Sequence, residues 1–252
     1  MIATAFEYLR PDHLEGALAA LAEDPEGTAI LGGGTWLVPD LDSGVRHARR
    51  VLDLAGLGLA RIERLQGGSL RVGAMCTYAQ LAHAPSPLLA MMAAQITGGV
   101  AIANQATIGG SLVAARAQSD APAAAIAARA VALLASARGE RRVAVHELAP
   151  RRDEILIALE LPPPAPGNGY RKLTLGASSW PIATAAAAVG RNGAIVVLGG
   201  VSATPIRIEA QRPDELAVTV EHPLEDALAP AAYRAAVAAP LARRALEDAL
   251  RR

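Results

Sequence analysis

The stretch Ile30-Leu31-Gly32-Gly33-Gly34-Thr35-Trp36-Leu37 joins a short apolar run to three consecutive glycines. The run that ends at Leu31 is typical of a β-strand, so the glycines are expected to turn the chain at the strand's end. Glycine adopts positive φ at no steric cost, which lets successive backbone N–H groups point into one concavity. Because such a concavity binds phosphate oxygens, and Thr35 adds a hydroxyl donor, the stretch predicts a phosphate site.

A second glycine turn, Thr107-Ile108-Gly109-Gly110-Ser111, lies much further along the chain. The hydroxyl groups of Thr107 and Ser111 flank its two glycines. Two such turns from distant parts of one chain could clamp both phosphates of a pyrophosphate. Either turn alone has a simpler explanation, because a Gly-Gly pair is more often a tight turn imposed by close packing.

The standard nucleotide signatures are absent from the sequence. It contains neither the G-x-x-x-x-G-K-[ST] pattern of P-loop ATPases nor the G-x-G-x-x-G pattern of a Rossmann site. Its one cysteine, Cys76, rules out an internal disulfide and a four-cysteine iron–sulfur cluster. The five histidines show no metal-ligand spacing. We therefore predict no metal site and no catalytic residue in this chain.

The chain has 252 residues, of which 52% are hydrophobic and only 3% aromatic, so its core is built from Ala, Leu, Val and Ile. Its 24 basic and 24 acidic residues balance, which gives no reason to expect nucleic acid or an anionic membrane surface as a partner. No uncharged apolar stretch reaches the length of about 18 residues that a membrane span needs. Residues 1–10 lack the apolar centre of a signal peptide, and we expect a cytoplasmic protein.

Composition shifts at residues 162–167, where three consecutive prolines fit neither a helix interior nor a paired strand. We place a domain boundary here, between an N-terminal region of residues 1–165 and a C-terminal domain of residues 168–252. Both parts mix strands with helices, so the predicted fold class is α+β. The elements expected are strands at 28–31, 51–54 and 131–136, a hairpin of 60–64 with 69–74, strands at 170–175, 182–189 and 194–201 with an Asn192-Gly193 turn between the last two, and a final helix at 230–251.

The two glycine turns together resemble the flavoprotein subunits of molybdenum hydroxylases, which include the medium subunits of carbon monoxide dehydrogenase and the FAD domain of xanthine dehydrogenase. Residues 30–37 are similar to that family's first FAD motif, and residues 107–112 match its second. Further pieces follow in the family's order, at 51–54, 70–77, 153–156, 161–162, 170–172, 233–234 and 243–246. The likeness covers nearly the whole chain.

The resemblance implies a FAD-binding fold of the p-cresol methylhydroxylase/vanillyl-alcohol oxidase type, followed by a small C-terminal α+β domain with a three-stranded sheet. It implies that backbone N–H groups wrap the FAD pyrophosphate along Ile30, Leu31, Gly32, Gly33, Gly34, Thr35, Trp36, Leu37, Thr107, Ile108, Gly109, Gly110 and Ser111. Asp120 would bind the ribityl or ribose hydroxyls, and Leu156 would pack near the isoalloxazine ring. Lys172 would lie near the flavin, where its positive charge favours reduced, anionic flavin.

The chain departs from the family at several positions. Ala103-Asn104 stand where the family often has Arg-Asn, so an arginine contact is absent. Ala114 and then Arg116-Ala117 stand where it often has Asn and then Asp-Pro, and Trp36 occupies a position that is often polar.

Single residues also have structural explanations. Asp120 precedes Ala121-Pro122, a pattern typical of a helix N-cap, and one carboxylate could serve both as a cap and as a FAD contact. Lys172 is more often a solvated strand lysine than a flavin ligand. Trp36 and Trp180 are more often core or interface aromatics than flavin stackers.

The resemblance implies an electron carrier in a complex of heterotrimers. A large partner subunit would hold the molybdenum–pterin cofactor, and a small one would hold two [2Fe–2S] clusters. Electrons would reach FAD in this chain and leave to NAD+, a quinone or oxygen. Two alternatives stay open: a stand-alone flavin oxidoreductase that acts directly on a small substrate, and a scaffold subunit that has lost FAD.

Overall fold

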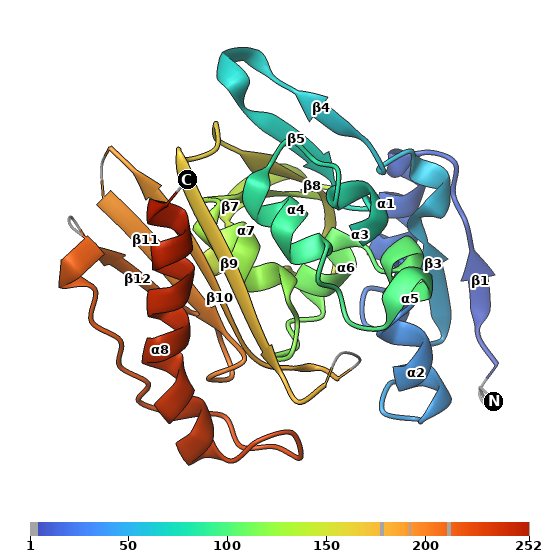
Figure 1. The fold of residues 1–252 in the computed structure, drawn as a ribbon. Coiled ribbons are helices and arrows are strands. Elements are labelled where there is room, and N and C mark those ends of the chain that lie inside the picture. Colours follow the sequence, from blue (N-terminus) through green and yellow to red (C-terminus); the bar gives the residue numbers. More distant parts are fainter. Residues whose placement is uncertain (1–4, 177–178, 192, 211–212, 252) are drawn as a thin grey trace.

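The computed structural model describes residues 5–176, 179–191, 193–210 and 213–251. The first of its sheets is parallel. The strand order is β1-β3-β2, and parallel neighbours need crossover connections. Two helices occupy these connections, and the first glycine turn lies between the end of β2 and the start of α2 (Figure 1). The bounds are β1 (Glu7–Leu9), α1 (Leu14–Glu23), β2 (Thr28–Leu31), α2 (Leu37–Asp42), β3 (Arg50–Asp53) and the 3₁₀ turn η1 (Leu54–Leu57).

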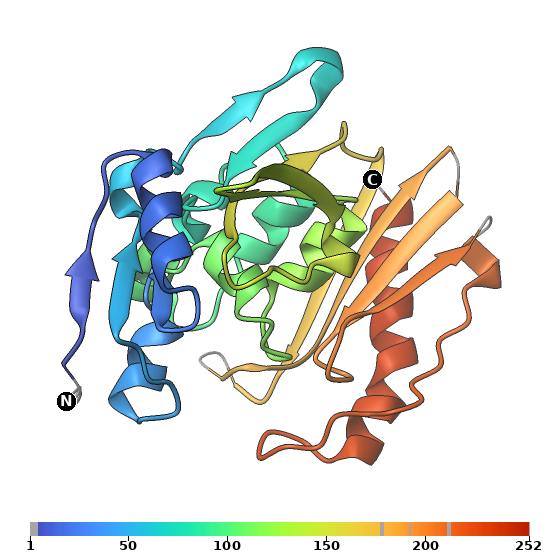
Figure 2. The same cartoon turned by 180° about the vertical axis from the view of Figure 1, so that it is seen from behind.

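The second sheet is antiparallel, with strand order β4-β5-β8-β6-β7. It occupies the middle of the molecule, between the N-terminal and C-terminal sheets (Figure 2). The predicted hairpin is confirmed as β4 paired with β5. The bounds are β4 (Ile62–Arg64), η2 (Gln66–Gly68), β5 (Leu70–Gly73), β6 (Val131–Ser136), β7 (Gly139–Ala144), η3 (Val145–Glu147) and β8 (Ile155–Leu161).

Five short helices lie between β5 and β6 in the sequence, and they carry the second glycine turn. That turn opens α6, and Asp120 directly precedes α7. The bounds are α3 (Tyr78–Leu81), α4 (Pro87–Ala93), α5 (Gly99–Gln105), α6 (Ile108–Val113) and α7 (Ala121–Ala127).

The third sheet has the order β12-β11-β10-β9 and lies between α8 on one face and α4 and α7 on the other (Figure 1). The three predicted strands and the final helix are present, but the prediction of a three-stranded sheet is wrong by one strand. The extra edge strand, β12, alternates half-buried apolar residues with exposed charged ones and has no continuous apolar run. Asn192, of the predicted turn, lies outside the described residues. The bounds are β9 (Gly167–Thr174), β10 (Pro181–Gly190), β11 (Gly193–Gly199), β12 (Ile206–Ala210), η4 (Pro213–Glu215) and α8 (Ala231–Leu250).

Small residues let this sheet pack closely on both faces. Ala183, Ala185 and Ala187 face the cluster formed with α8, whereas Ala186 and Ala188 belong to the main core, as the two-residue period of a strand requires. A Cβ on Gly169 would lie 2.0 Å from the Ala245 carbonyl oxygen, so β9 meets α8 backbone to backbone.

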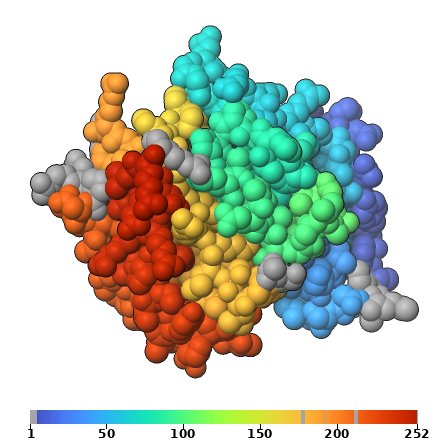
Figure 3. All heavy atoms as spheres, viewed as in Figure 1, coloured from blue at the N-terminus to red at the C-terminus, as the bar shows by residue number. Residues whose placement is uncertain are grey.

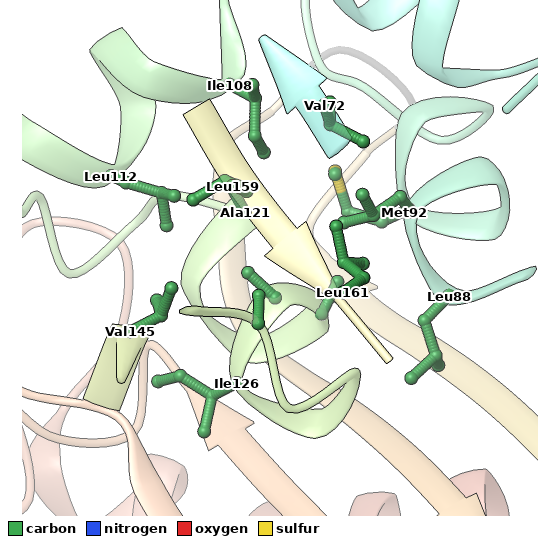
Figure 4. Packing of buried hydrophobic residues seen from close by; sticks show 14 of the residues in the cluster. Val72, Leu88, Met92, Ile108, Leu112, Ala121, Ile126, Val145, Leu159 and Leu161 are labelled. Carbon is green, nitrogen blue, oxygen red and sulfur yellow. The ribbon is translucent and has the colours of Figure 1, made fainter. Parts of the chain in front are cut away.

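The main core joins the helical segment to the two larger sheets. Ile108 and Leu112 of α6, Ile126 of α7 and Leu159 of β8 point into it (Figure 4). Ile195 of β11 belongs to the same cluster, so the sheet that follows the proline-rich segment shares its core with the region before it. No helix among the described residues is long and apolar enough to cross a membrane.

Candidate cofactor-binding site

The first glycine turn lies close to the Thr107 side chain of the second turn and to the backbone of Gln105, just before that turn. A Cβ on Gly33 would lie 1.7 Å from the Gln105 carbonyl oxygen, and one on Gly32 would lie 2.9 Å from Thr107 Oγ1. A side chain at Gly33 would therefore overlap the segment that leads into the second turn. Gly34 has a φ of +75°, a conformation that glycine adopts without strain. The first turn therefore needs glycine for two reasons: Gly32 and Gly33 lie too close to neighbouring atoms to carry a side chain, and Gly34 has a positive φ.

The second turn is hydrogen-bonded to the segment that follows β5. Gly109 N donates to Ala74 O (2.9 Å) and Ile108 N to Cys76 O (3.0 Å). A Cβ on Gly109 would lie 2.7 Å from Ala74 Cβ, which explains this glycine by packing. Thr107 caps α6, its Oγ1 accepting from Gly110 N at 3.2 Å.

Backbone donors remain available in the first turn. The N–H groups of Gly33, Gly34 and Thr35 make no hydrogen bond to another described residue, whereas Gly34 O accepts from Val38 N at 2.9 Å. Free N–H groups in a glycine turn are the donors that phosphate oxygens accept from. The first turn therefore retains the chemistry that the sequence predicted for it.

A cavity of about 130 Å³, hereafter the first cavity, lies beside both turns. Its wall is mainly apolar, with one basic and one acidic side chain. It is lined by Ile30, Gly32, Arg46, Leu54, Ala74, Met75, Thr107, Gly109, Gly110, Val113, Ala114, Glu154, Ile155 and Leu156. The predicted contact Leu156 is thus brought next to the glycine turns.

A second cavity, of about 210 Å³, adjoins the other ends of the same turns. Polar and aromatic side chains make up much of its wall. It is lined by Thr35, Trp36, Tyr78, Ile96, Thr97, Gly98, Ile102, Ala106, Ser111, Ser119, Asp120 and Trp180. In the space-filling view, α5 (green) adjoins the α2 segment (blue) near this region (Figure 3).

Asp120 and Lys172 form a buried ion pair at the second cavity, with Nζ to Oδ2 at 3.0 Å and side chains 6% (Lys172) and 1% (Asp120) exposed. Tyr170 OH donates to Asp120 Oδ1 at 2.8 Å, and Lys172 Nζ also donates to Gln95 O and Thr97 Oγ1, both at 2.8 Å. Burial raises the pKa of Asp120, and the charge and hydrogen bond of Lys172 oppose that rise.

Two structural interpretations of these residues are wrong. Asp120 occupies the N-cap position of α7, but its side chain makes no capping hydrogen bond. Lys172 is buried rather than solvated. Tyr170, which the sequence analysis missed, lies two residues before Lys172 in β9, and the period of a strand places both on one face.

A second buried hydrogen bond reaches the second glycine turn. Tyr78 OH donates to Ser111 Oγ at 2.9 Å, and both residues are buried. Burial raises the pKa of Tyr78 strongly, so the phenol stays protonated and remains a donor. Because the Ser111 oxygen accepts from Tyr78, its own hydrogen is free to donate elsewhere. No sequence signal pairs these two residues.

Two tryptophans stack at the wall of the second cavity. The ring centroids of Trp36 and Trp180 are 4.7 Å apart with an interplanar angle of 23°. The Arg116 guanidinium lies 5.7 Å from the Trp36 centroid, within cation–π range, and is paired with Asp40. Trp36 from the first turn is thereby joined to the segment that precedes β10, as expected of interface aromatics.

Comparisons with known proteins agree with this arrangement. Residues 4–164 match the family described as the FAD binding domain in molybdopterin dehydrogenase. The chain belongs to this family. Its expected relationship to the flavoprotein subunits of molybdenum hydroxylases, and its FAD cofactor, are confirmed.

The similarity extends beyond the matched domain. The chain is 27% identical to the carbon monoxide dehydrogenase medium chain of Hydrogenophaga pseudoflava, over 99% of this chain and 98% of that protein. It is 30% identical to the caffeine dehydrogenase subunit beta of Pseudomonas sp. (strain CBB1), over 66% of this chain and 61% of that protein. The structure of a carbon monoxide dehydrogenase from Hydrogenophaga pseudoflava that lacks the Mo-pyranopterin moiety of its molybdenum cofactor aligns with a TM-score of 0.89 and 26% identity, covering 100% and 99% of the two chains. The expected fold type is confirmed.

Proposed function

We propose that this chain is the FAD-carrying electron-transfer subunit of a molybdenum hydroxylase complex. The observation that carries the proposal is the contact between two glycine turns with a cavity on either side. FAD has a pyrophosphate at its centre and a bulky group at each end, so a paired turn flanked by two cavities fits its shape. The residues of the two turns, 30–37 and 107–111, would hold the pyrophosphate.

The two cavities suit different halves of FAD. The second cavity is larger and offers hydroxyl groups and the Asp120 carboxylate, which match the ribityl chain, and aromatic rings, which match the isoalloxazine system. The first is smaller and mainly apolar, as an adenine site needs. On this assignment Asp120 and Lys172 lie by the flavin half, and Leu156 contacts the adenosine half instead of the isoalloxazine ring.

The chain's own contribution is to bind FAD, to orient it and to tune its reduction potential. FAD supplies the capacity to accept electrons from one-electron carriers and to pass them on to an acceptor. Lys172 is paired with Asp120 at the wall of the second cavity, and its three hydrogen bonds hold the ammonium group in place. A positive charge there favours added electrons, so the lysine would raise the reduction potential of a bound flavin.

The proposed partner subunits are those of a molybdenum hydroxylase complex. Both curated relatives are named as one subunit of a larger dehydrogenase. We propose a large subunit with the molybdenum–pterin cofactor, a small subunit with two [2Fe–2S] clusters, and NAD+, a quinone or oxygen as the acceptor. We also propose that residues 1–165 form the FAD-binding region and residues 168–252 the C-terminal domain, since the chain changes sheet between Leu161 and Gly167.

The first test is an absorption spectrum of the purified full chain, followed by acid release and chromatography of its cofactor. We expect flavin bands and release of FAD, not FMN. A colourless chain that also refuses added FAD would favour the scaffold alternative.

The second test uses the complex purified with its partners. Withholding this chain during assembly should abolish reduction of the acceptor while substrate still reduces the iron–sulfur clusters. Full acceptor reduction without the chain would contradict the proposal. Substrate oxidation by the FAD-loaded chain alone would favour the stand-alone flavin enzyme.

A further inference from the structure

The charged groups of the first cavity differ in how they are compensated. Of the two that line it, Glu154 is fully engaged: its oxygens accept from Arg141 Nε (2.6 Å), Arg141 Nη2 (2.8 Å) and the Arg151 backbone N–H (2.7 Å). The Arg141 hydrogen bond is the main reason that the pKa of Glu154 is lowered. The negative charge at this wall is therefore neutralised within the protein.

Arg46 is the other charged residue at that wall, and its charge is not compensated. Arg49, in the same segment, binds Asp24 through two hydrogen bonds, and Arg50 binds Glu7 and Glu23. The Arg46 side chain makes no hydrogen bond or ion pair with any residue that the structure describes. The arginine of this segment that reaches the cavity is thus the one left without an anion.

The backbone fixes Arg46 relative to the turns. Its N–H donates to Asp40 O at 3.0 Å, which folds the α2–β3 connection back onto α2. Helix α2 begins directly after the first glycine turn. Gly32, Thr107 and Gly110 line the same cavity as Arg46, which is otherwise an exposed residue, so Arg46 borders the cavity that both turns share.

We propose that Arg46 binds the pyrophosphate of FAD and supplies the full positive charge that the glycine turns lack. The inference rests on the proposed function. A guanidinium group presents a planar fork of donors that matches phosphate oxygens. Ala103 stands where the family often has an arginine before the second motif, and Arg46 supplies a cation to the site from a different element.

The test compares ligands with and without phosphate. FAD, ADP and riboflavin are titrated into the cofactor-free full chain, as wild type, Arg46→Ala and Arg46→Lys. We expect Arg46→Ala to weaken FAD and ADP binding by about tenfold, the effect of one charge-assisted contact, and to leave riboflavin binding unchanged. Arg46→Lys should restore part of the loss, because it keeps the charge but not the fork. Added salt should weaken FAD binding to wild type more steeply than to Arg46→Ala.

Arg64→Ala is the matched control, since Arg64 lies on β4 and lines neither cavity. It should bind all three ligands as wild type does, and a thermal melt of each variant checks folding. Equal FAD affinity in wild type and Arg46→Ala would overturn the Arg46 assignment alone. An equal loss of riboflavin binding would overturn it too, because the effect would not depend on phosphate. Failure of wild type to bind FAD and ADP would instead overturn the proposed function, and this inference with it.

Discussion

Lys172 Nζ, on β9 of the C-terminal sheet, lies 3.0 Å from Asp120 Oδ2, at the entrance to α7. The contact joins two parts of the chain on either side of the proline-rich segment. Neither side chain is appreciably exposed, so each depends on the other for its charge to be tolerated.

Replacing Lys172 with Met should destabilise the fold by about 3–5 kcal/mol, because it leaves a buried carboxylate without its cation. The pKa of Asp120 is already raised by burial, and removing Lys172 raises it further. A carboxyl group whose folded pKa exceeds its unfolded value contributes stability at low pH and loses it as pH rises through the folded pKa. Urea unfolding should therefore show a larger loss at pH 8 than at pH 5.

The double variant Asp120→Asn/Lys172→Met is the control for that prediction. It removes both charges and should recover much of the lost stability. A Lys172→Met deficit that is the same at both pH values would mean that Asp120 is not the group responsible.

Gly33→Ala should separate the two turns, because the new Cβ would lie 1.7 Å from Gln105 O. We expect FAD affinity to fall at least tenfold and the fold to lose roughly 1–3 kcal/mol, the usual cost of overpacking. Gly190→Ala is the matched control, since a Cβ there would meet nothing within 4 Å. Titration with FAD and thermal melts distinguish them; similar behaviour of both variants would show that the turns do not need this close contact.

Tyr78→Phe and Ser111→Ala should not be additive. Each removes the same buried hydrogen bond of 2.9 Å, which contributes about 1 kcal/mol. A double-mutant cycle by urea unfolding should give a coupling of that size. Repeating it on FAD affinity tests whether Ser111 donates to the cofactor, and strictly additive effects would exclude coupling through this bond.

Glu154→Gln should lower the free energy of unfolding at neutral pH and change it little in acid. The pKa of Glu154 is lowered chiefly by Arg141, so its stabilising contribution is present above the unfolded pKa and disappears as pH falls through the folded one. We expect a loss of about 2 kcal/mol at pH 7 and convergence with wild type in acid, once the pH lies below the folded pKa of Glu154. Glu221→Gln, at an exposed position, should change stability little at either pH, and a constant offset for Glu154→Gln across the range would contradict the assignment.

The sequence predicted the first glycine turn, where Gly34 has a positive φ, because that residue type follows from local backbone geometry. It did not predict that Gly109 and Gly110 lie inside α6, where Ala74 O and Thr107 Oγ1 already accept from their N–H groups. It also predicted the β4–β5 hairpin and the final helix, whose signals are local. Tyr78 with Ser111, and Trp36 with Trp180, could not be predicted, because such pairs form only when distant elements pack. The buried state of Lys172 was missed for the same reason, since its partners lie on another part of the chain.

Strand β9 links the two parts of the chain through its side chains. Tyr170 and Lys172 belong to the C-terminal sheet by pairing, yet their hydrogen bonds go to Asp120. A chimaera that joined this chain to another subunit at the prolines would replace both residues. Asp120 would then lose its native hydrogen-bond partners. Recombination that preserves the cofactor cavity must therefore cut after Trp180, which also lines that cavity, and the exchangeable unit is not the one that the linker suggests.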